Sequence, residues 1–286
     1  MDCELGIPGY ILEAIVTRAL DEDIGTGDIT SRCTVDEGTP CRAEIAAKDT
    51  GVVAGISVAE AVFRRLDPDA AFSFASHDGE RVAPGQVILG IAGDTQAILI
   101  GERTALNFLQ RMSGIATLTA KFVEAVKGTQ AQICDTRKTA PGLRVLDKYA
   151  VRAGGGRNHR FGLSDGVLIK DNHIRAAGGI GEAVRRARES AHHLLAIEVE
   201  TQTAGQVEEA MRAGADVIML DNMGLDDVRE AVRFIAGRCR TEVSGNVNLT
   251  TVRAYAECGV DLISVGALTH SVSALDLSLE IIDARG

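Results

Sequence analysis

The chain has 286 residues, of which 45% are hydrophobic but only 3% aromatic, so its core must be built from aliphatic side chains. The formal net charge of -10 argues against a general affinity for nucleic acid or an anionic membrane, so any anion site must be local. The sequence has no long apolar run and no secretion signal at residues 1–6, and its six scattered cysteines lack metal-ligand spacing. We therefore expect a cytoplasmic protein with reduced thiols.

The first third of the sequence predicts a small α+β domain. Apolar residues between 9 and 22 fall on one helical face, and residues 22–28 predict a loop. Short runs at 42–47, 71–75 and 86–91 predict strands, with a helix over 58–66. Residues 101–127 then predict one long helix, in which Ser113 and Gly114 form a potential interruption.

The rest of the sequence predicts alternating strands and helices. Six buried strands are predicted at 132–134, 166–169, 195–199, 217–220, 242–243 and 262–265. Helices are clearest at 181–191, 204–213, 225–236 and 251–258. This alternation indicates parallel βαβ units in a closed or nearly closed barrel, which could have eight strands, have seven or be incomplete.

Polar residues follow each predicted strand, where parallel barrels assemble their active sites. Between Arg137 and Arg175 there are nine Lys or Arg residues against three acids. Taken singly, Arg144, Lys148, Arg152 and Arg157 also fit an exposed basic loop. Together the cations indicate a pocket for a substrate with several negative groups, and the glycines at 154–156 suggest backbone folded closely over a ligand.

The later strand ends carry carboxylates and then small residues. Glu200 and Asp221 could coordinate Mg²⁺, directly or through water, or could bind ribose hydroxyls. Because side chains alternate along a strand, only one of Glu198 and Glu200 is expected to face the site, and Glu198 is assigned to an ion-pair network. The turns at 244–246 and 266–267 predict a phosphate site made of backbone N–H groups.

Taken together, these stretches resemble the quinolinate phosphoribosyltransferases, the decarboxylating enzymes of NAD synthesis, along nearly the whole chain. The matching strings are ERTALN (102–107), DTRKT (135–139), NHR (158–160), LIKDNH (168–173), MLDN (219–222), EVSGN (242–246) and SVGALTH (264–270). Several distinctive strings in one order make the resemblance specific.

The resemblance implies an N-terminal α/β sandwich domain (1–112, joined by 271–286) and an incomplete, about seven-stranded α/β barrel (113–270). It implies that quinolinate and phosphoribosyl pyrophosphate react to give nicotinate mononucleotide, pyrophosphate and CO₂, with Mg²⁺ as cofactor. It also implies a homodimer, or a higher oligomer, whose active sites are shared across the interface. Arg103 of one subunit would then reach the quinolinate site of the other.

The resemblance also assigns roles to individual residues. Lys138, Lys170, Glu200 and Asp221 are the catalytic residues, and Glu200 and Asp221 face the ribose and Mg²⁺. The full set of implied substrate-binding residues is Arg103, Thr136, Arg137, Lys138, His159, Arg160, Lys170, Glu200, Asp221, Ser244, Gly245, Asn246, Val265, Gly266, Ala267 and His270.

Three other functions are compatible with parts of this pattern. Lys170 at a strand end could be the Schiff-base lysine of an aldolase, although an aldolase would not explain the cluster of Arg137, Lys138 and Arg160. A non-catalytic protein could keep the anion pocket without turnover. A relative encoded beside molybdate transporters shares the fold and much of the motif pattern.

Overall fold

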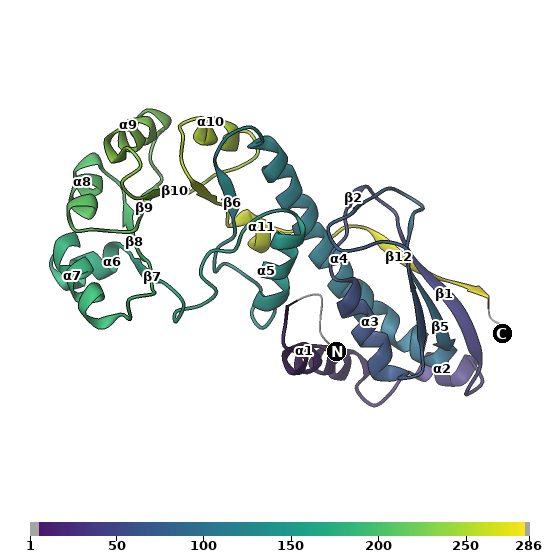
Figure 1. Ribbon diagram of the computed structural model, residues 1–286. Coiled ribbons are helices and arrows are strands. Elements are labelled where there is room, and N and C mark those ends of the chain that lie inside the picture. The colour runs from purple at the N-terminus through teal and green to yellow at the C-terminus, as the bar shows by residue number, and fades with distance from the viewer. Residues whose placement is uncertain (1–5, 284–286) are drawn as a thin grey trace. The chain divides into compact units, whose positions relative to one another are not determined.

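The computed structural model describes residues 6–283, so Cys3 and the outermost ends of the predicted domains lie outside the described residues. The chain forms two compact units, both drawn in Figure 1. One unit contains the described residues up to Ala120, Ala140–Gly155 and the described residues from Val272 onward, and the other contains Lys121–Thr139 and Gly156–Ser271. The predicted domain limits remain a prediction, and the units differ from them mainly in Ala140–Gly155.

The first unit is built on a four-stranded antiparallel sheet with the order β12-β1-β5-β3. Strand β1 (Pro40–Ala47) pairs with β5 (Val87–Asp94) on one side and with the C-terminal strand β12 (Leu277–Asp283) on the other, and β3 (Ala71–Phe74) pairs with β5. Alternate residues of β1 are buried because successive side chains of a strand point to opposite faces. The end of the chain thus completes a sheet formed by its first third.

The first unit also contains helices, which are labelled in Figure 1. They are α1 (Gly9–Ile24), α2 (Ile29–Thr34), α3 (Ile56–Leu66), α5 (Arg144–Ala153) and most of α4 (Thr95–Ala125), and a small ladder joins β2 (Gly51–Val52) to β4 (Arg81–Val82). Leu12, Val16 and Leu20 of α1 are buried, which confirms the predicted apolar face. The helix continues through Ile24, so the predicted loop begins later than expected.

The long helix α4 is continuous through Ser113 and Gly114, so the potential interruption does not occur. The Ser113 hydroxyl accepts a hydrogen bond from the backbone N–H of Ala54 (3.0 Å). A Cβ atom added to Gly114 would lie 2.2 Å from the backbone oxygen of Ser273. Both residues are therefore needed where other segments approach the helix closely.

The basic stretch after residue 137 is partly a buried helix, which neither sequence interpretation predicted. Leu146 and Val151 of α5 are buried, and Lys148 is only 2% exposed. A Cβ atom on Gly154, just after α5, would lie 2.4 Å from the backbone oxygen of Ala116 on α4. The proposal that this glycine lets backbone fold over a ligand is wrong, because Gly154 serves the packing of two helices.

The second unit is an α/β barrel segment with six parallel strands. Their spatial order is β6-β11-β10-β9-β8-β7, and they comprise β6 (Gln132–Cys134), β7 (Val167–Ile169), β8 (Ile197–Thr201), β9 (Val217–Asp221), β10 (Arg240–Ser244) and β11 (Leu262–Ser264). An isolated parallel bridge between Cys134 and Arg157 stands in place of the expected seventh strand. The α/β class and the six predicted strands are confirmed, and among the described residues the regular strands number six rather than seven.

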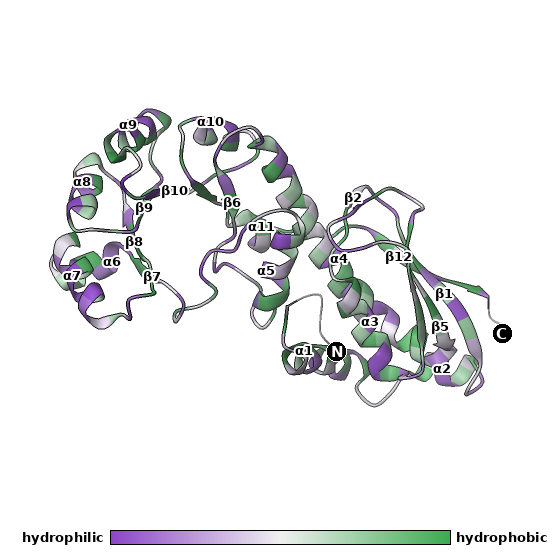
Figure 2. Ribbon diagram, viewed as in Figure 1, coloured by the Kyte–Doolittle hydropathy of each residue, from purple (hydrophilic) through white to green (hydrophobic). Residues whose placement is uncertain are grey.

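Helices alternate with the strands of this unit, as Figure 1 shows. They are α6 (Asp171–Ala177), α7 (Ile180–Ser190), α8 (Ala204–Arg212), α9 (Leu225–Ile235), α10 (Val252–Ala256) and α11 (Ala267–His270). Figure 2 shows hydrophobic and hydrophilic residues mixed around α7, α8 and α9, and the buried positions include Val184, Val207 and Val228. Among the described residues, no helix combines the length and apolar character needed to cross a membrane.

Candidate active site

A cavity of about 610 Å³ lies in the second unit. Its walls come from the C-terminal ends of the strands and the segments that follow them, where a parallel barrel places its site. Every site residue predicted from the sequence lines this cavity except Arg103: Thr136, Arg137, Lys138, His159, Arg160, Lys170, Glu200, Asp221, Ser244, Gly245, Asn246, Val265, Gly266, Ala267 and His270. Arg103 is an exposed residue of α4 in the first unit.

Two arginines make one wall of the cavity strongly cationic. Burial and the neighbouring charge of Arg137 both lower the pKa of Arg160, so the two guanidinium groups repel each other. Arg160 Nη1 donates a hydrogen bond to the backbone oxygen of Gly166 (2.9 Å), which fixes the side chain. An anion between these two groups would relieve their repulsion.

Lys138 directly follows Arg137, and hydrogen bonds of its backbone hold it in place. Its N–H donates to the hydroxyl of Thr136 (3.1 Å), and its carbonyl accepts from the hydroxyl of Thr269 (2.9 Å). A Cβ atom added to Gly266 would lie 3.0 Å from Cδ of Lys138 and 3.1 Å from Cδ2 of His270. Glycine at 266 therefore lets this turn approach two cavity side chains closely.

Lys170 and Glu200 form an ion pair inside the cavity. Lys170 directly follows β7 and Glu200 is on the neighbouring strand β8, and Lys170 Nζ lies 2.8 Å from Glu200 Oε2. Their side chains are 48% and 12% exposed, so the lysine is open to a ligand while the carboxylate is mostly covered.

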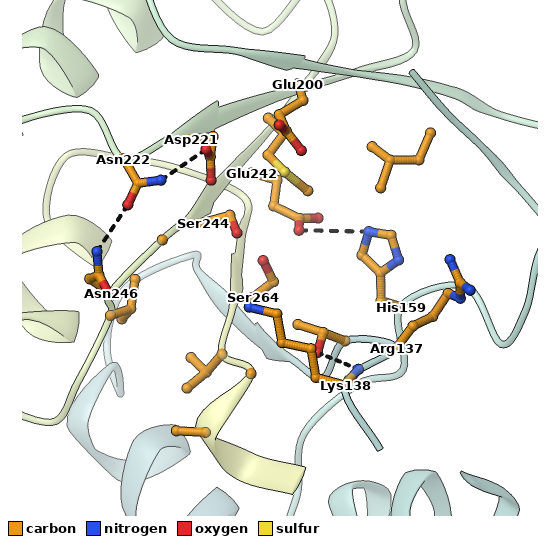
Figure 3. A pocket seen from close by; sticks show the side chains of 18 of the residues that line it. Arg137, Lys138, His159, Glu200, Asp221, Asn222, Glu242, Ser244, Asn246 and Ser264 are labelled. Carbon is orange, nitrogen blue, oxygen red and sulfur yellow. Dashed lines mark hydrogen bonds and ion pairs between the residues drawn. The ribbon is translucent and has the colours of Figure 1, made fainter. Parts of the chain in front are cut away.

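Asp221 and the turn after β10 form the opposite wall. Asn222 donates from Nδ2 to Asp221 Oδ2 (2.9 Å) and accepts from Asn246 Nδ2 through its Oδ1 (3.1 Å), as Figure 3 shows. Gly245 has φ +96°, and a Cβ atom there would lie 2.3 Å from Asn222 Oδ1. Only glycine combines this backbone conformation with so close a neighbour.

His159, Glu198 and Glu242 form a buried cluster at the cavity wall. His159 Nε2 lies 2.9 Å from Glu198 Oε2 and 3.7 Å from Glu242 Oε1, and Figure 3 shows the Glu242 carboxylate facing the imidazole ring. Burial and then the charge of Glu198 raise the pKa of Glu242 to about 8.

The cluster bears on two sequence interpretations. Glu198 pairs with His159, and of Glu198 and Glu200 only Glu200 lines the cavity, as predicted, although strand alternation is not the reason because residues two apart share one face of a strand. The sequence reasoning also left Glu242 out of the site, although its side chain lines the cavity. The sequence did contain a signal for Glu242, because it is an acidic residue in a segment predicted to be a buried strand.

The fold and this cavity define a class of protein: an α/β-barrel enzyme that receives a substrate with several negative groups beside two strand ends that carry carboxylates. Comparison with known families identifies the family within this class. The model "Quinolinate phosphoribosyl transferase, C-terminal domain" matches residues 115–280, and the corresponding N-terminal domain model matches residues 28–113. The chain belongs to the quinolinate phosphoribosyltransferase family.

Individual relatives agree along most of their lengths. The chain is 48% identical over 270 residues to a probable nicotinate-nucleotide pyrophosphorylase (carboxylating) of Bacillus subtilis, covering 94% of this chain and 93% of the relative. It is 46% identical to a chloroplastic enzyme of the same name from Arabidopsis thaliana, covering 96% and 84%. The solved structure of the nicotinate-nucleotide pyrophosphorylase from Francisella tularensis matches with a TM-score of 0.93 at 40% identity, covering 96% and 97%.

Proposed function

We propose that this chain transfers the phosphoribosyl group of phosphoribosyl pyrophosphate to quinolinate and releases CO₂, giving nicotinate mononucleotide and pyrophosphate. The observation that carries the proposal is the gathering of Arg137, Lys138, Arg160 and Lys170 in one cavity with Glu200 and Asp221. Relatives that are 45–48% identical over most of the chain are named for this reaction. The enzyme is therefore a pentosyltransferase of pyridine nucleotide synthesis.

The cationic wall binds the two carboxylates of quinolinate. Arg137 and Arg160 offer forked donors that match a carboxylate, and their mutual repulsion favours an anion between them. Lys138 lies on the same wall, and Lys170 is paired with Glu200 inside the cavity. The turns at Gly245 and Gly266 line the cavity and receive the phosphate of the sugar, because backbone N–H groups of such turns can bind an anion.

The reaction needs no protein nucleophile. The pyridine nitrogen bonds to the anomeric carbon while the carbon–oxygen bond to pyrophosphate breaks, and positive charge develops on the sugar. Glu200 and Asp221 stabilise this charge, and the cations orient the ring and the leaving group. Loss of CO₂ leaves an electron pair on ring C2, which the positively charged ring nitrogen stabilises until a proton is added.

The donor set fits the Mg²⁺ ion expected from the sequence. Glu200 and Asp221 end neighbouring strands and line the same cavity, and each has one oxygen held by a neighbouring side chain, Lys170 or Asn222. Mg²⁺ usually keeps several waters and binds through one or two carboxylates together with substrate phosphates. We propose that Glu200 and Asp221 hold it through water, where it would neutralise charge on the leaving pyrophosphate.

We further propose a homodimer, or a higher oligomer, that works in the cytoplasm. The family resemblance supports a shared active site, in which Arg103 of one subunit serves the quinolinate site of the other. The exposed position of Arg103 on α4 leaves its guanidinium available for such a contact. Size measurement in solution and loss of quinolinate affinity in Arg103→Ala test the two parts of this proposal.

The aldolase alternative receives no support from the cavity. A Schiff-base lysine must lose its proton to attack a carbonyl, and desolvation usually favours that loss. Lys170 instead is half exposed, and its Nζ lies 2.8 Å from Oε2 of Glu200, so it is not in the desolvated pocket that such a lysine needs.

The direct test is to incubate the purified protein with quinolinate, phosphoribosyl pyrophosphate and Mg²⁺ and to measure nicotinate mononucleotide and CO₂. Nicotinate, which lacks one carboxylate, should be a poor substrate because the cations for that group would be left unpaired. Arg137→Ala and Arg160→Ala should each raise the KM for quinolinate by roughly 10- to 100-fold, as expected for loss of a charged hydrogen bond. Absence of both products, or equal turnover of nicotinate, would overturn the proposal.

A surface arginine provides the matched control. Arg212 on α8 is exposed and pairs with Glu208, outside the cavity. Arg212→Ala should keep the wild-type KM, so that a loss seen in the cavity variants reflects the site rather than the removal of any positive charge.

A further inference from the structure

The cluster of His159, Glu198 and Glu242 contains more carboxylate oxygens than hydrogen-bond donors. Oε1 of Glu198 and Oε1 of Glu242 are both buried without a hydrogen-bond partner. The Glu242 side chain is 1% exposed, and one ligand atom from each of the three residues lies within 4.8 Å of the others. An arrangement of this kind requires either a metal ion or an additional proton.

The hydrogen bonds of His159 decide between these two solutions. Its Nδ1 accepts a hydrogen bond from the backbone N–H of Arg160 (2.8 Å). A neutral imidazole has one acceptor nitrogen, so the proton must be on Nε2, which donates to Glu198. A protonated Nε2 has no lone pair for a metal ion, so the geometry points to a proton.

The additional proton belongs on Glu242. With a neutral His159, ionisation of both glutamates would bury two adjacent negative charges that share one donor. Glu242 is the more deeply buried of the two, and Glu198 already accepts the Nε2–H bond. The raised pKa of Glu242, caused first by burial and then by Glu198, agrees with this geometry.

We propose that Glu242 is a protonated, uncharged acid in the working enzyme and acts as a positioning residue for the dicarboxylate site. Its O–H donates to Glu198, which keeps Glu198 fixed on the Nε2–H of His159. The cavity that contains Arg137 and Arg160 then has one buried negative charge in this wall instead of two. Ionised Glu242 adds the second charge and weakens the binding of a dianion.

The charged and titratable groups around Glu242 come from several elements. Glu198 is on β8 and His159 follows the Cys134–Arg157 bridge, while Ser264 of β11 shares a hydrogen bond with Glu242. Cys134 of β6 also faces Glu242, Asp135 and Glu198, and its burial raises the pKa of its thiol, so it stays neutral. Glu242 is therefore the group of this cluster expected to change charge between neutral and alkaline pH.

The kinetic test compares the KM for quinolinate in the wild type and in Glu242→Gln from about pH 6 to about pH 9.5, on both sides of the Glu242 pKa of about 8. The carboxylates of quinolinate are ionised throughout this range. The wild-type KM should rise on the order of tenfold on the alkaline side, as expected for one added unit charge near the substrate. The Gln variant, which is uncharged at every pH, should have a flat profile.

Glu208→Gln is the matched control, because Glu208 is an exposed glutamate on α8 outside the cavity. Its profile should follow the wild type. A Glu242→Gln profile that rises in parallel with the wild type would overturn the proposal.

A second measurement separates this proposal from the proposed function, on which its effect on quinolinate binding rests. Infrared spectra of the substrate-free protein at neutral pH should show a protonated carboxyl band in the wild type that is missing in Glu242→Gln. Lack of that band would overturn the protonation state even in an active enzyme, whereas its presence in a protein inactive on quinolinate would refute the function alone. Bound metal that is lost in Glu242→Gln would also overturn the proposal.

The proposal can be tested even if the substituted protein does not fold. If Glu242→Gln fails to fold, nuclear magnetic resonance of wild-type protein labelled at the glutamate carboxyl carbons still decides it. One buried glutamate should titrate well above the others. Titration of every glutamate near the ordinary value would refute a neutral Glu242.

Discussion

The buried Glu242 should make the stability of the protein fall as the pH rises. Its pKa is about 8 in the folded state against 4.5 for an ordinary glutamate, so between these values the folded state binds a proton that the unfolded state has lost. The free energy of unfolding therefore decreases through this range and levels off above about pH 8. At about 1.4 kcal/mol per pH unit, the whole interval corresponds to on the order of 5 kcal/mol.

Urea unfolding of the wild type and Glu242→Gln at several pH values between about 5 and 9 measures this loss. Circular dichroism is the suitable probe because the chain has no Trp. Relative to the wild type, the Gln variant should gain stability progressively with pH, whereas Glu208→Gln should not. A difference between wild type and Glu242→Gln that is constant over the whole pH range would refute the reasoning, because an uncharged side chain cannot follow a proton.

Two further substitutions test other parts of the chain. Asp147 is fully buried and accepts hydrogen bonds from Nε and Nη2 of Arg111 (3.0 and 2.8 Å), so Arg111→Met should cost about 3–5 kcal/mol in urea unfolding, and adding Asp147→Asn should recover much of the loss. Gly245→Ala should raise the KM for phosphoribosyl pyrophosphate about tenfold or more, since a Cβ would displace Asn222, whereas Gly237→Ala, with φ +74° and no neighbour within 4 Å, should leave this KM unchanged.

The sequence predicted the strands of the second unit well because of how they are buried. Strands of a parallel sheet are covered on both faces, so β9 and β11 appear as short, mainly apolar runs that turn signals separate. The polar residues at their ends could be assigned to one cavity because parallel strands end on the same side of a barrel.

Features that depend on distant partners could not be predicted in the same way. Helix α5 looked like a basic loop because its burial depends on Arg111, which contacts Asp147 from another helix. Gly154 was interpreted as a ligand-binding residue because the sequence does not show its close neighbour, Ala116 of α4. No local pattern of residues encodes either contact.

The position of a polar residue along its strand decides what its substitution should change. Arg137 and Lys138 lie beyond the end of β6 and are exposed, so their loss should weaken binding with little effect on folding. Glu242 lies inside β10, where the side chains of a parallel sheet are normally apolar. A titratable group at that depth affects both the stability of the barrel and the charge of the cavity. In the wild type, the free energy of unfolding and the KM for quinolinate should therefore change over the same pH range. In Glu242→Gln, neither quantity should show this change.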